Sequence, residues 1–346
     1  MRRATYLLLL FLLLTIPLQA AEFQAPAPPP AAEKIMPDHP GDFSQGIREM
    51  VLKAAERLHP DLFDAGRLSF SILAGVMLIS LLKTFDGPVK KAADLAGTAS
   101  IAGGLLLTSH SMIRLGAETV TEISEYGKLL LPVMTGALAA QGGVTKSTAL
   151  FAGTAGFMAL LSGLISALLI PMTYLYLAFS LGSAALGQET LKKLRDLVRS
   201  VISWSLKSVI TVFTTYISLT GVITGTTDAA ALKAAKATVS TVVPVVGGIL
   251  SGASETMLLS VAVLKNAAGL YGIFAVLAIF LEPFLRILLD YWMLKATGAV
   301  CSVFGSGPVS DLLEDFSKAM GILLAMTGTG CIMMLLGTVC FMKGVG

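Results

Sequence analysis

The sequence predicts an all-α, polytopic integral membrane protein with an internal repeat and with helices interrupted by glycine and proline. The chain has 346 residues, of which 55% are hydrophobic and only 14% are charged. Soluble domains contain about 25% charged residues. The mean hydropathy is +0.79. Glycine, with 34 residues, is abundant, as is common in membrane helices. Lipid is therefore the expected solvent for most of the chain.

Residues 1–21 have the features of a signal peptide. Arg2 and Arg3 precede a short apolar core, Leu7–Ile16, which is too short for an ordinary spanning helix. The small residues Ala20–Ala21 follow and suit cleavage. An uncleaved N-terminal anchor is the alternative.

The segment 22–67 is predicted to be exported, as a linker rich in proline and alanine followed by a short amphipathic helix over Asp42–His59. One face of that helix is apolar and the other carries charged residues. The apolar positions are Ile47, Met50, Val51, Ala54 and Leu58. This helix lies either on the membrane or a partner, or on the membrane domain of its own chain.

Residues 68–346 are predicted to form the polytopic membrane domain. The basic loop that holds Lys83, Lys90 and Lys91 is expected in the cytoplasm, and the polar stretch 114–128 is expected outside. The segments Ser147–Ile170 and Pro171–Gly187 are expected to form a hairpin or a kinked pair. The other apolar segments are Leu68–Leu82, Ala92–Ile113, Val209–Thr226, Thr256–Leu264, Ala267–Leu289 and Ala319–Met342.

Two further segments are amphipathic. Leu191–Leu206 carries basic residues along one side and apolar residues along the other, which is typical of a helix at the cytoplasmic interface. It could bind anionic lipid, or it could be an ordinary loop that sets the topology. Val309–Lys318 is predicted to be a short amphipathic helix that leads into the last span.

A motif of the form P-V-x-x-G-x-L occurs twice, at Pro132–Leu138 and at Pro244–Leu250. We interpret the two copies as parts of a repeat that covers about residues 92–207 and 208–342, with coincidence in a glycine-rich chain as the alternative. Broken backbone is tolerated at membrane depth only where it is buried in protein or lines a wet cavity. Paired broken segments can mark a transport pathway. The candidate broken-helix residues are Pro132, Gly136, Pro244 and Gly248.

Glu282, Arg286 and Asp290 are spaced four residues apart in an apolar segment, so they share one helix face and can pair along it. Ionisable groups inside a membrane are costly and suggest a function. These residues are our candidates for a polar pathway or a contact with another subunit. The alternative is a self-neutralised stripe that only fixes packing.

The chain contains no H-E-x-x-H, G-x-S-x-G, Walker A or Rossmann motif. Its formal net charge of +3 is too small to indicate nucleic acid as a partner, and Cys301, Cys331 and Cys340 form no C-x-x-C pair. We therefore expect no enzyme activity, no catalytic residue, no cofactor and no metal site. A membrane enzyme assembled from distant helices is the weakest alternative.

The export signal, the two proline motifs, L-E-P-F-L-R at Leu281–Arg286 and the closing V-S-D-L-L-E-D-F-S-K…G-I-L-L-A run at Val309–Ala325 together resemble the stage III sporulation protein AE family. The resemblance covers most of the chain from about Leu68 and rests on the order and spacing of the motifs. No catalytic residue is established for that family, so the resemblance implies none here.

The resemblance implies a multi-pass protein of the mother-cell-derived membrane around the forespore, with an extracytoplasmic N-terminal segment. There it would be a subunit of a channel-like or secretion-like complex that connects the mother cell and the forespore. The implied partners are other stage III sporulation membrane proteins, the lipid bilayer and further copies of the chain. A stand-alone transporter or permease is the alternative function.

Overall fold

The computed structural model describes residues 25–37, 43–82, 88–140, 144–219, 267–303 and 307–343, and all regular structure within these ranges is helical. Five of the described helices are long and apolar enough to cross a membrane, which confirms the predicted class. The elements are α2 (Pro30–Glu33), α3 (Phe43–Arg57), α4 (His59–Leu82), α5 (Pro88–Ala140), α6 (Val144–Leu164), the π-helical turn η1 (Ile165–Leu169), α7 (Ile170–Leu186), α8 (Glu189–Leu219), α11 (Ala267–Val303) and α12 (Gly307–Lys343).

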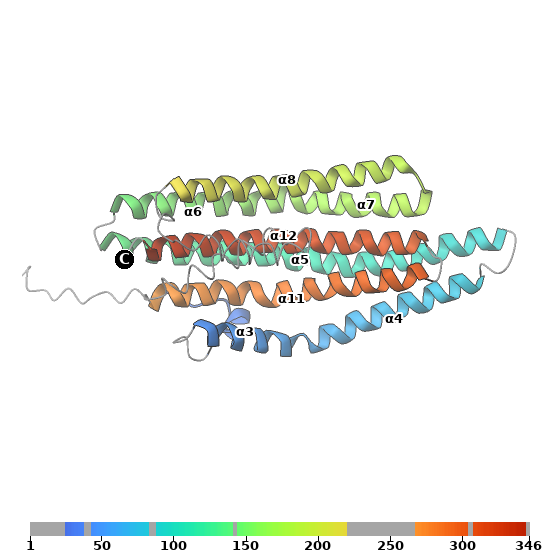
Figure 1. The fold of residues 1–346 in the computed structure, drawn as a ribbon, viewed down its shortest axis with the longest axis horizontal. Coiled ribbons are helices and arrows are strands. Elements are labelled where there is room, and N and C mark those ends of the chain that lie inside the picture. The colour runs from blue at the N-terminus through green and yellow to red at the C-terminus, as the bar shows by residue number, and fades with distance from the viewer. Residues whose placement is uncertain are drawn as a thin grey trace, which may run out of the picture.

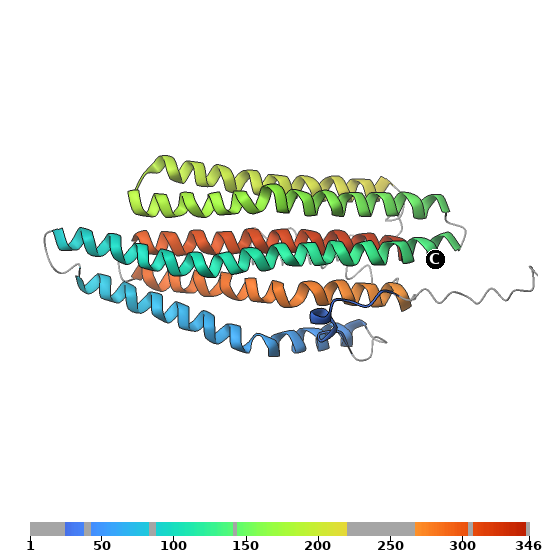
Figure 2. The same cartoon turned by 180° about the vertical axis from the view of Figure 1, so that it is seen from behind.

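The helices form an elongated bundle with their axes roughly aligned (Figure 1). Helices α12 and α5 occupy the middle, and α6, α7 and α8 lie along one side. Helices α11, α4 and α3 lie along the other side, as the view from behind also shows (Figure 2). The middle pair therefore separates two outer groups of helices.

Helix α12 forms the core of this bundle. In its most apolar 18-residue window, 94% of the residues are buried, whereas the value is 22% for the α6–α7 run and for α8. A helix that is apolar on all sides must be surrounded by other apolar surface. Helix α12 meets this need through contacts with α5, α6, α7, α8 and α11.

Hydroxyl groups buried in α12 are satisfied within the helix. Thr327, Thr329 and Thr338 donate to the carbonyl oxygens four residues earlier, at 3.1, 2.7 and 2.9 Å. A threonine paired in this way leaves no unsatisfied donor in an apolar environment. These polar residues therefore do not prevent α12 from lying in the core.

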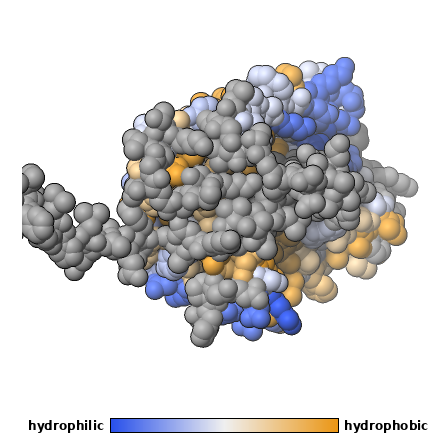
Figure 3. Space-filling view, turned by 60° about the vertical axis from the view of Figure 1, so that its left-hand side comes forward, coloured by the Kyte–Doolittle hydropathy of each residue, from blue (hydrophilic) through white to orange (hydrophobic). Residues whose placement is uncertain are grey.

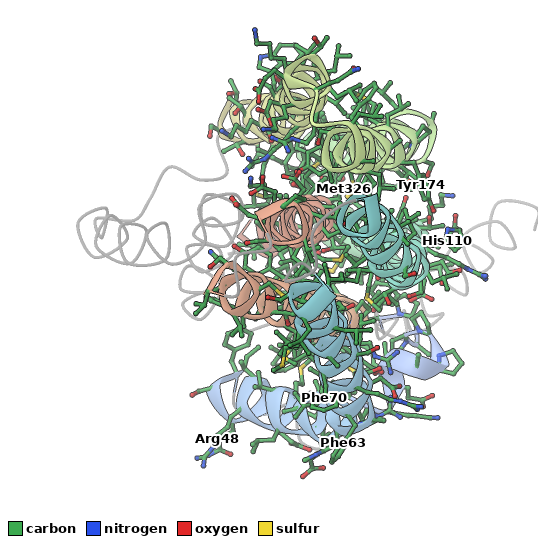
Figure 4. All side chains as sticks on the ribbon, turned by 90° about the vertical axis from the view of Figure 1, so that its right-hand side faces the viewer. Arg48, Phe63, Phe70, His110, Tyr174 and Met326 are labelled. Atoms are coloured by element: carbon green, nitrogen blue, oxygen red, sulfur yellow. The ribbon has the colours of Figure 1, made fainter. Side chains whose placement is uncertain are left out.

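Large apolar side chains remain exposed on the outer helices. Phe70 of α4, Leu107 of α5, Leu175 of α7 and Trp204 of α8 are among them. Figure 3 shows apolar and polar surface side by side on one face, and in Figure 4 Phe63 and Phe70 point away from the bundle. Such surface is the expected contact of a membrane protein with lipid.

The helices are longer than the segments predicted from hydropathy. Helix α5 has 53 residues, which corresponds to about 80 Å at the usual rise, while the hydrocarbon core of a bilayer is about 30 Å thick. This one helix joins the predicted segment Ala92–Ile113 to the polar stretch 114–128, so that stretch is helical and does not separate two spans. The charged pair Arg114–Glu118 of that stretch is exposed on the helix surface, so it does not end the helix.

The structure also differs from the prediction of a broken segment at Pro132 and Gly136. Both residues lie inside the continuous helix α5. A proline removes one backbone hydrogen bond, but the neighbouring Leu130, Leu131 and Met134 are buried in the core and hold the helix in place. Pro244 and Gly248 lie outside the described residues, so the internal repeat stays a prediction.

Residues 144–186 form one continuous helical run rather than a hairpin. Helices α6 and α7 are joined by the π-helical turn Ile165–Leu169, directly before Pro171. Helix α7 ends at Gly187, whose φ of 67° is the left-handed conformation that favours glycine. The amphipathic segments Leu191–Leu206 and Val309–Lys318 are likewise parts of the longer helices α8 and α12.

Two basic helix starts lie at the same end of the bundle. Helices α5 and α8 both begin at the end where α11 gives way to α12 (Figure 1). Lys90 and Lys91 lie near the start of α5, and Lys192 and Lys193 near the start of α8. A single orientation therefore puts both segments on the same side of a membrane, as the positive-inside rule requires.

We predict that two glycines of α6 respond in opposite ways to alanine. A Cβ at Gly153 would lie 2.6 Å from Cζ of Tyr216, whose hydroxyl donates to the carbonyl oxygen of Ala149 at 2.7 Å and so fixes the ring. We expect G153A to lower the free energy of unfolding by about 1–3 kcal/mol.

The matched control is G156A, because nothing lies within 4 Å of a Cβ at that position. It should be neutral or slightly stabilising, by less than about 1 kcal/mol. Thermal unfolding in detergent measures both variants. Equal midpoints for G153A and G156A would contradict the packing of α6 against α8.

Candidate functional site: a charged seam between α3–α4 and α11

Helix α3 packs on the bundle through the small and apolar residues of one face. Gly46, Met50 and Ala54 are buried. A Cβ at Gly46 would lie 2.6 Å from the ring of Phe274 in α11, and the rings of Phe43 and Phe274 are 5.6 Å apart. Of the two readings of this amphipathic helix, the structure therefore supports packing on its own chain. Val51, which we assigned to the apolar face, is instead exposed.

Four charged residues connect these N-terminal helices to α11. Arg57 donates from Nη1 to Oε2 of Glu282 at 3.0 Å, and Nη2 of Arg286 lies 3.1 Å from Oε1 of the same carboxylate. Arg286 also forms an ion pair with Asp61 of α4, with Nε 2.9 Å from Oδ2, although neither atom has a hydrogen-bond partner. We call the alternating row Arg57–Glu282–Arg286–Asp61 the charged seam. It is partly buried, since the side chain of Glu282 is only 16% exposed.

Asp290 lies one turn beyond the seam and is not neutralised by it. It is 9% exposed, and its Oδ2 atom has no hydrogen-bond partner. The seam and Asp290 together contain three carboxylates and two guanidinium groups, so one carboxylate lacks a compensating charge among them.

The sequence predicted part of this arrangement. Glu282 and Arg286 pair along the helix, as their spacing indicated. Arg286 turns to Asp61 and forms no ion pair with Asp290 in the described part of the chain. Arg57 and Asp61 were missed as partners. The sequence offered one signal for them: Arg57 and Asp61 lie on either side of Pro60, at the end of an amphipathic helix.

A second buried ion pair lies between α8 and α12. Arg195 contacts Asp315, and their side chains are 12% and 4% exposed. Lys318 lies 3.5 Å from the same aspartate and 2.8 Å from Glu314. This pairing joins the basic segment of α8 to the first turns of the core helix α12.

The described residues offer no group of three or more histidine, cysteine, aspartate or glutamate side chains that could hold a metal ion. Cys301, Cys331 and Cys340 are free and buried. His110 of α5 lies 2.8 Å from the hydroxyl of Tyr174 on α7, at the surface (Figure 4). This hydrogen bond connects helices α5 and α7.

Fold and site together define a multi-pass helical membrane protein whose N-terminal helices are ion-paired to its membrane bundle. A model of the family described as stage III sporulation protein AE matches residues 36–345. The chain belongs to this family, and a role in sporulation follows from that membership.

One curated relative is the stage III sporulation protein AE of Bacillus subtilis (strain 168), which is 27% identical over 212 residues. The match covers 61% of this chain and 53% of the relative, so it spans about half of the relative's length. No solved structure matches the chain.

We predict a measurable coupling between Arg57 and Glu282. In a double-mutant cycle with R57Q, E282Q and the double variant, the coupling energy should exceed the roughly 0.2–1 kcal/mol of exposed ion pairs, because Glu282 is largely buried. The control cycle uses Arg114 and Glu118, an exposed pair at 2.7 Å. Unfolding in detergent provides the energies. A larger coupling energy for Arg114 and Glu118 than for Arg57 and Glu282 would contradict the pairing described for the charged seam.

We also predict that removing one negative charge has different effects at two positions of α11. E282Q leaves two guanidinium groups with a weaker acceptor and should cost about 1–3 kcal/mol of stability. D290N removes a buried charge that lacks a partner, so stability should stay the same or rise. The unfolding midpoints of the two variants at neutral pH test this prediction. A larger loss of stability in D290N than in E282Q would contradict it.

Proposed function

We propose that this protein is a membrane subunit of the channel-like or secretion-like complex that connects mother cell and forespore during endospore formation. It would reside in the mother-cell-derived membrane around the forespore, with its N-terminal segment on the extracytoplasmic side. Its partners would be other stage III sporulation membrane proteins and further copies of itself. Membership of the stage III sporulation protein AE family, over residues 36–345, carries this proposal.

The fold supports a role in assembly more than a pathway through one chain. Helix α12 fills the middle of the bundle, with 94% of its apolar window buried. A conduit would therefore form between copies or between subunits, along surfaces that the outer helices provide. The proposed stand-alone permease would need a route through the part of the bundle that α12 occupies.

Asp290 is the residue best suited to a subunit contact. Glu282 and Arg286 form ion pairs within the chain, whereas Asp290 forms none in the part of the chain that the structure describes, and its Oδ2 atom has no hydrogen-bond partner. An ionisable group in a spanning helix is a functional candidate when its charge is not compensated. Because Asp290 is buried, a basic residue of another subunit would complete the charge balance only after the neighbouring helices move apart.

Deletion of the gene in its endospore-forming host should block sporulation after engulfment. Heat-resistant spore counts and a late forespore reporter measure this, and the wild-type gene supplied in trans should restore both. Normal spore yield from the deletion strain would contradict the proposal. A pull-down in mild detergent from sporulating cells then identifies the partners.

A second experiment separates assembly from folding. A strain with D290N should accumulate the protein at the wild-type level yet form fewer heat-resistant spores and recover fewer partners in the pull-down. A control strain with R48Q changes an exposed charge of α3 and should sporulate normally. Solute flux through the purified protein in liposomes, without partners, would instead support the permease.

A further inference from the structure

A groove of about 810 Å³ lies between α8 and α12. Its lining contains four basic residues, Arg195, Arg199, Lys207 and Lys318, and one acidic residue, Asp196. The excess of positive charge makes the groove suitable for an anion. It is separate from the charged seam, which lies between α3–α4 and α11.

The basic residues of the groove fall into two classes. Arg195 is paired with Asp196 and Asp315, and Lys318 is paired with Glu314 and Asp315. Arg199 and Lys207 form no ion pair in the described part of the chain, although both line the groove. Two cations are therefore available to an external ligand, while the other two hold α8 against α12.

The spacing of these two cations suits a phosphate group. Arg199, Ser203 and Lys207 are separated by four residues each, so they occupy one face of α8 on successive turns. All three line the groove. A phosphate beside Ser203 can meet a guanidinium from one side and an ammonium from the other. Charge-assisted hydrogen bonds of this kind are among the strongest that proteins form.

The floor of the groove is apolar. Ile202 and Leu206 of α8 and Ile322 and Ala325 of α12 line it, and all four are buried in the bundle. These four side chains are covered by the protein itself, whereas Ile210, which also lines the groove, is half-buried. An apolar part of a ligand can therefore lie against Ile210 beside the anionic group.

The outer side of α8 indicates where the ligand comes from. Leu197, Val201, Trp204 and Val212 are exposed there, and tryptophan is enriched at the membrane–water interface. The helix thus presents an apolar ridge to the bilayer on a different side from its cations. The two sides meet where Trp204 neighbours Lys207, three residues further along. This arrangement is typical of amphipathic helices that bind anionic membrane surfaces.

We propose that the groove between α8 and α12 binds an anionic phospholipid, with its phosphate between Arg199 and Lys207 and an acyl chain against the half-buried Ile210. The lipid would fasten α8 to the core helix in addition to the Arg195–Asp315 pair. This assignment does not depend on the proposed function, because it rests on the groove alone.

The test uses the full-length protein reconstituted in nanodiscs with equal amounts of phosphatidylglycerol and phosphatidylcholine. After transfer to detergent, native mass spectrometry counts the lipids that stay bound. The wild type should retain phosphatidylglycerol in preference to phosphatidylcholine. R199Q/K207Q should lose at least about tenfold in that retention, since two charged contacts are removed.

The control variant is R48Q/K193Q, which removes the same net charge at two exposed positions outside the groove. It should retain phosphatidylglycerol like the wild type. The unfolding midpoint of each variant in detergent verifies that the variants are folded. Equal retention of the two lipids by the wild type, or unchanged retention by R199Q/K207Q, would overturn the proposal. If inorganic phosphate alone raised the unfolding midpoint of the wild type as much as phosphatidylglycerol does, the groove would be assigned to a free anion instead.

Discussion

The burial of helix α12 is the constraint on which the arrangement of the other helices depends. Its apolar residues extend around the whole helix, so every side must be covered, and α5, α6, α7, α8 and α11 provide that cover. Glycines let some of these helices approach closely. A Cβ at Gly337 would lie 2.5 Å from Thr154 of α6, and a Cβ at Gly127 of α5 would lie 3.1 Å from Met334. The outer helices then face lipid with their remaining apolar surface.

Charged residues act at the places where the outer helices join this core. The seam at Glu282 attaches the N-terminal helices to α11, and the Arg195–Asp315 pair attaches α8 to α12. Removing one partner of such a pair leaves a buried charge without compensation, which costs far more than the pair contributes when intact. These ion pairs therefore select one arrangement of helices whose apolar surfaces could pack in several ways.

The sequence was sufficient for the class of fold and for much of the local structure. Composition and apolar segments predicted a helical membrane protein, and the spacing of Glu282 and Arg286 indicated their pairing. The polar stretch around Glu118 resembled a loop, because charge on the surface of a long helix and charge in a loop look alike in sequence. The central place of α12 was equally hidden, since every apolar segment is a candidate for the core. Arg57 and Asp61 could not be identified as partners of α11, because only the folded chain brings them together.

A disulfide between α5 and α12 tests the central place of α12 most directly. A Cβ at Gly116 would lie 3.7 Å from Cβ of Leu323, within the range that disulfides require. In a background with Cys301, Cys331 and Cys340 replaced by alanine, G116C/L323C should form this bond in membranes under mild oxidation, whereas G103C/L323C should not. Absence of the bond in G116C/L323C, or equal bond formation in both variants, would contradict a bundle built around α12.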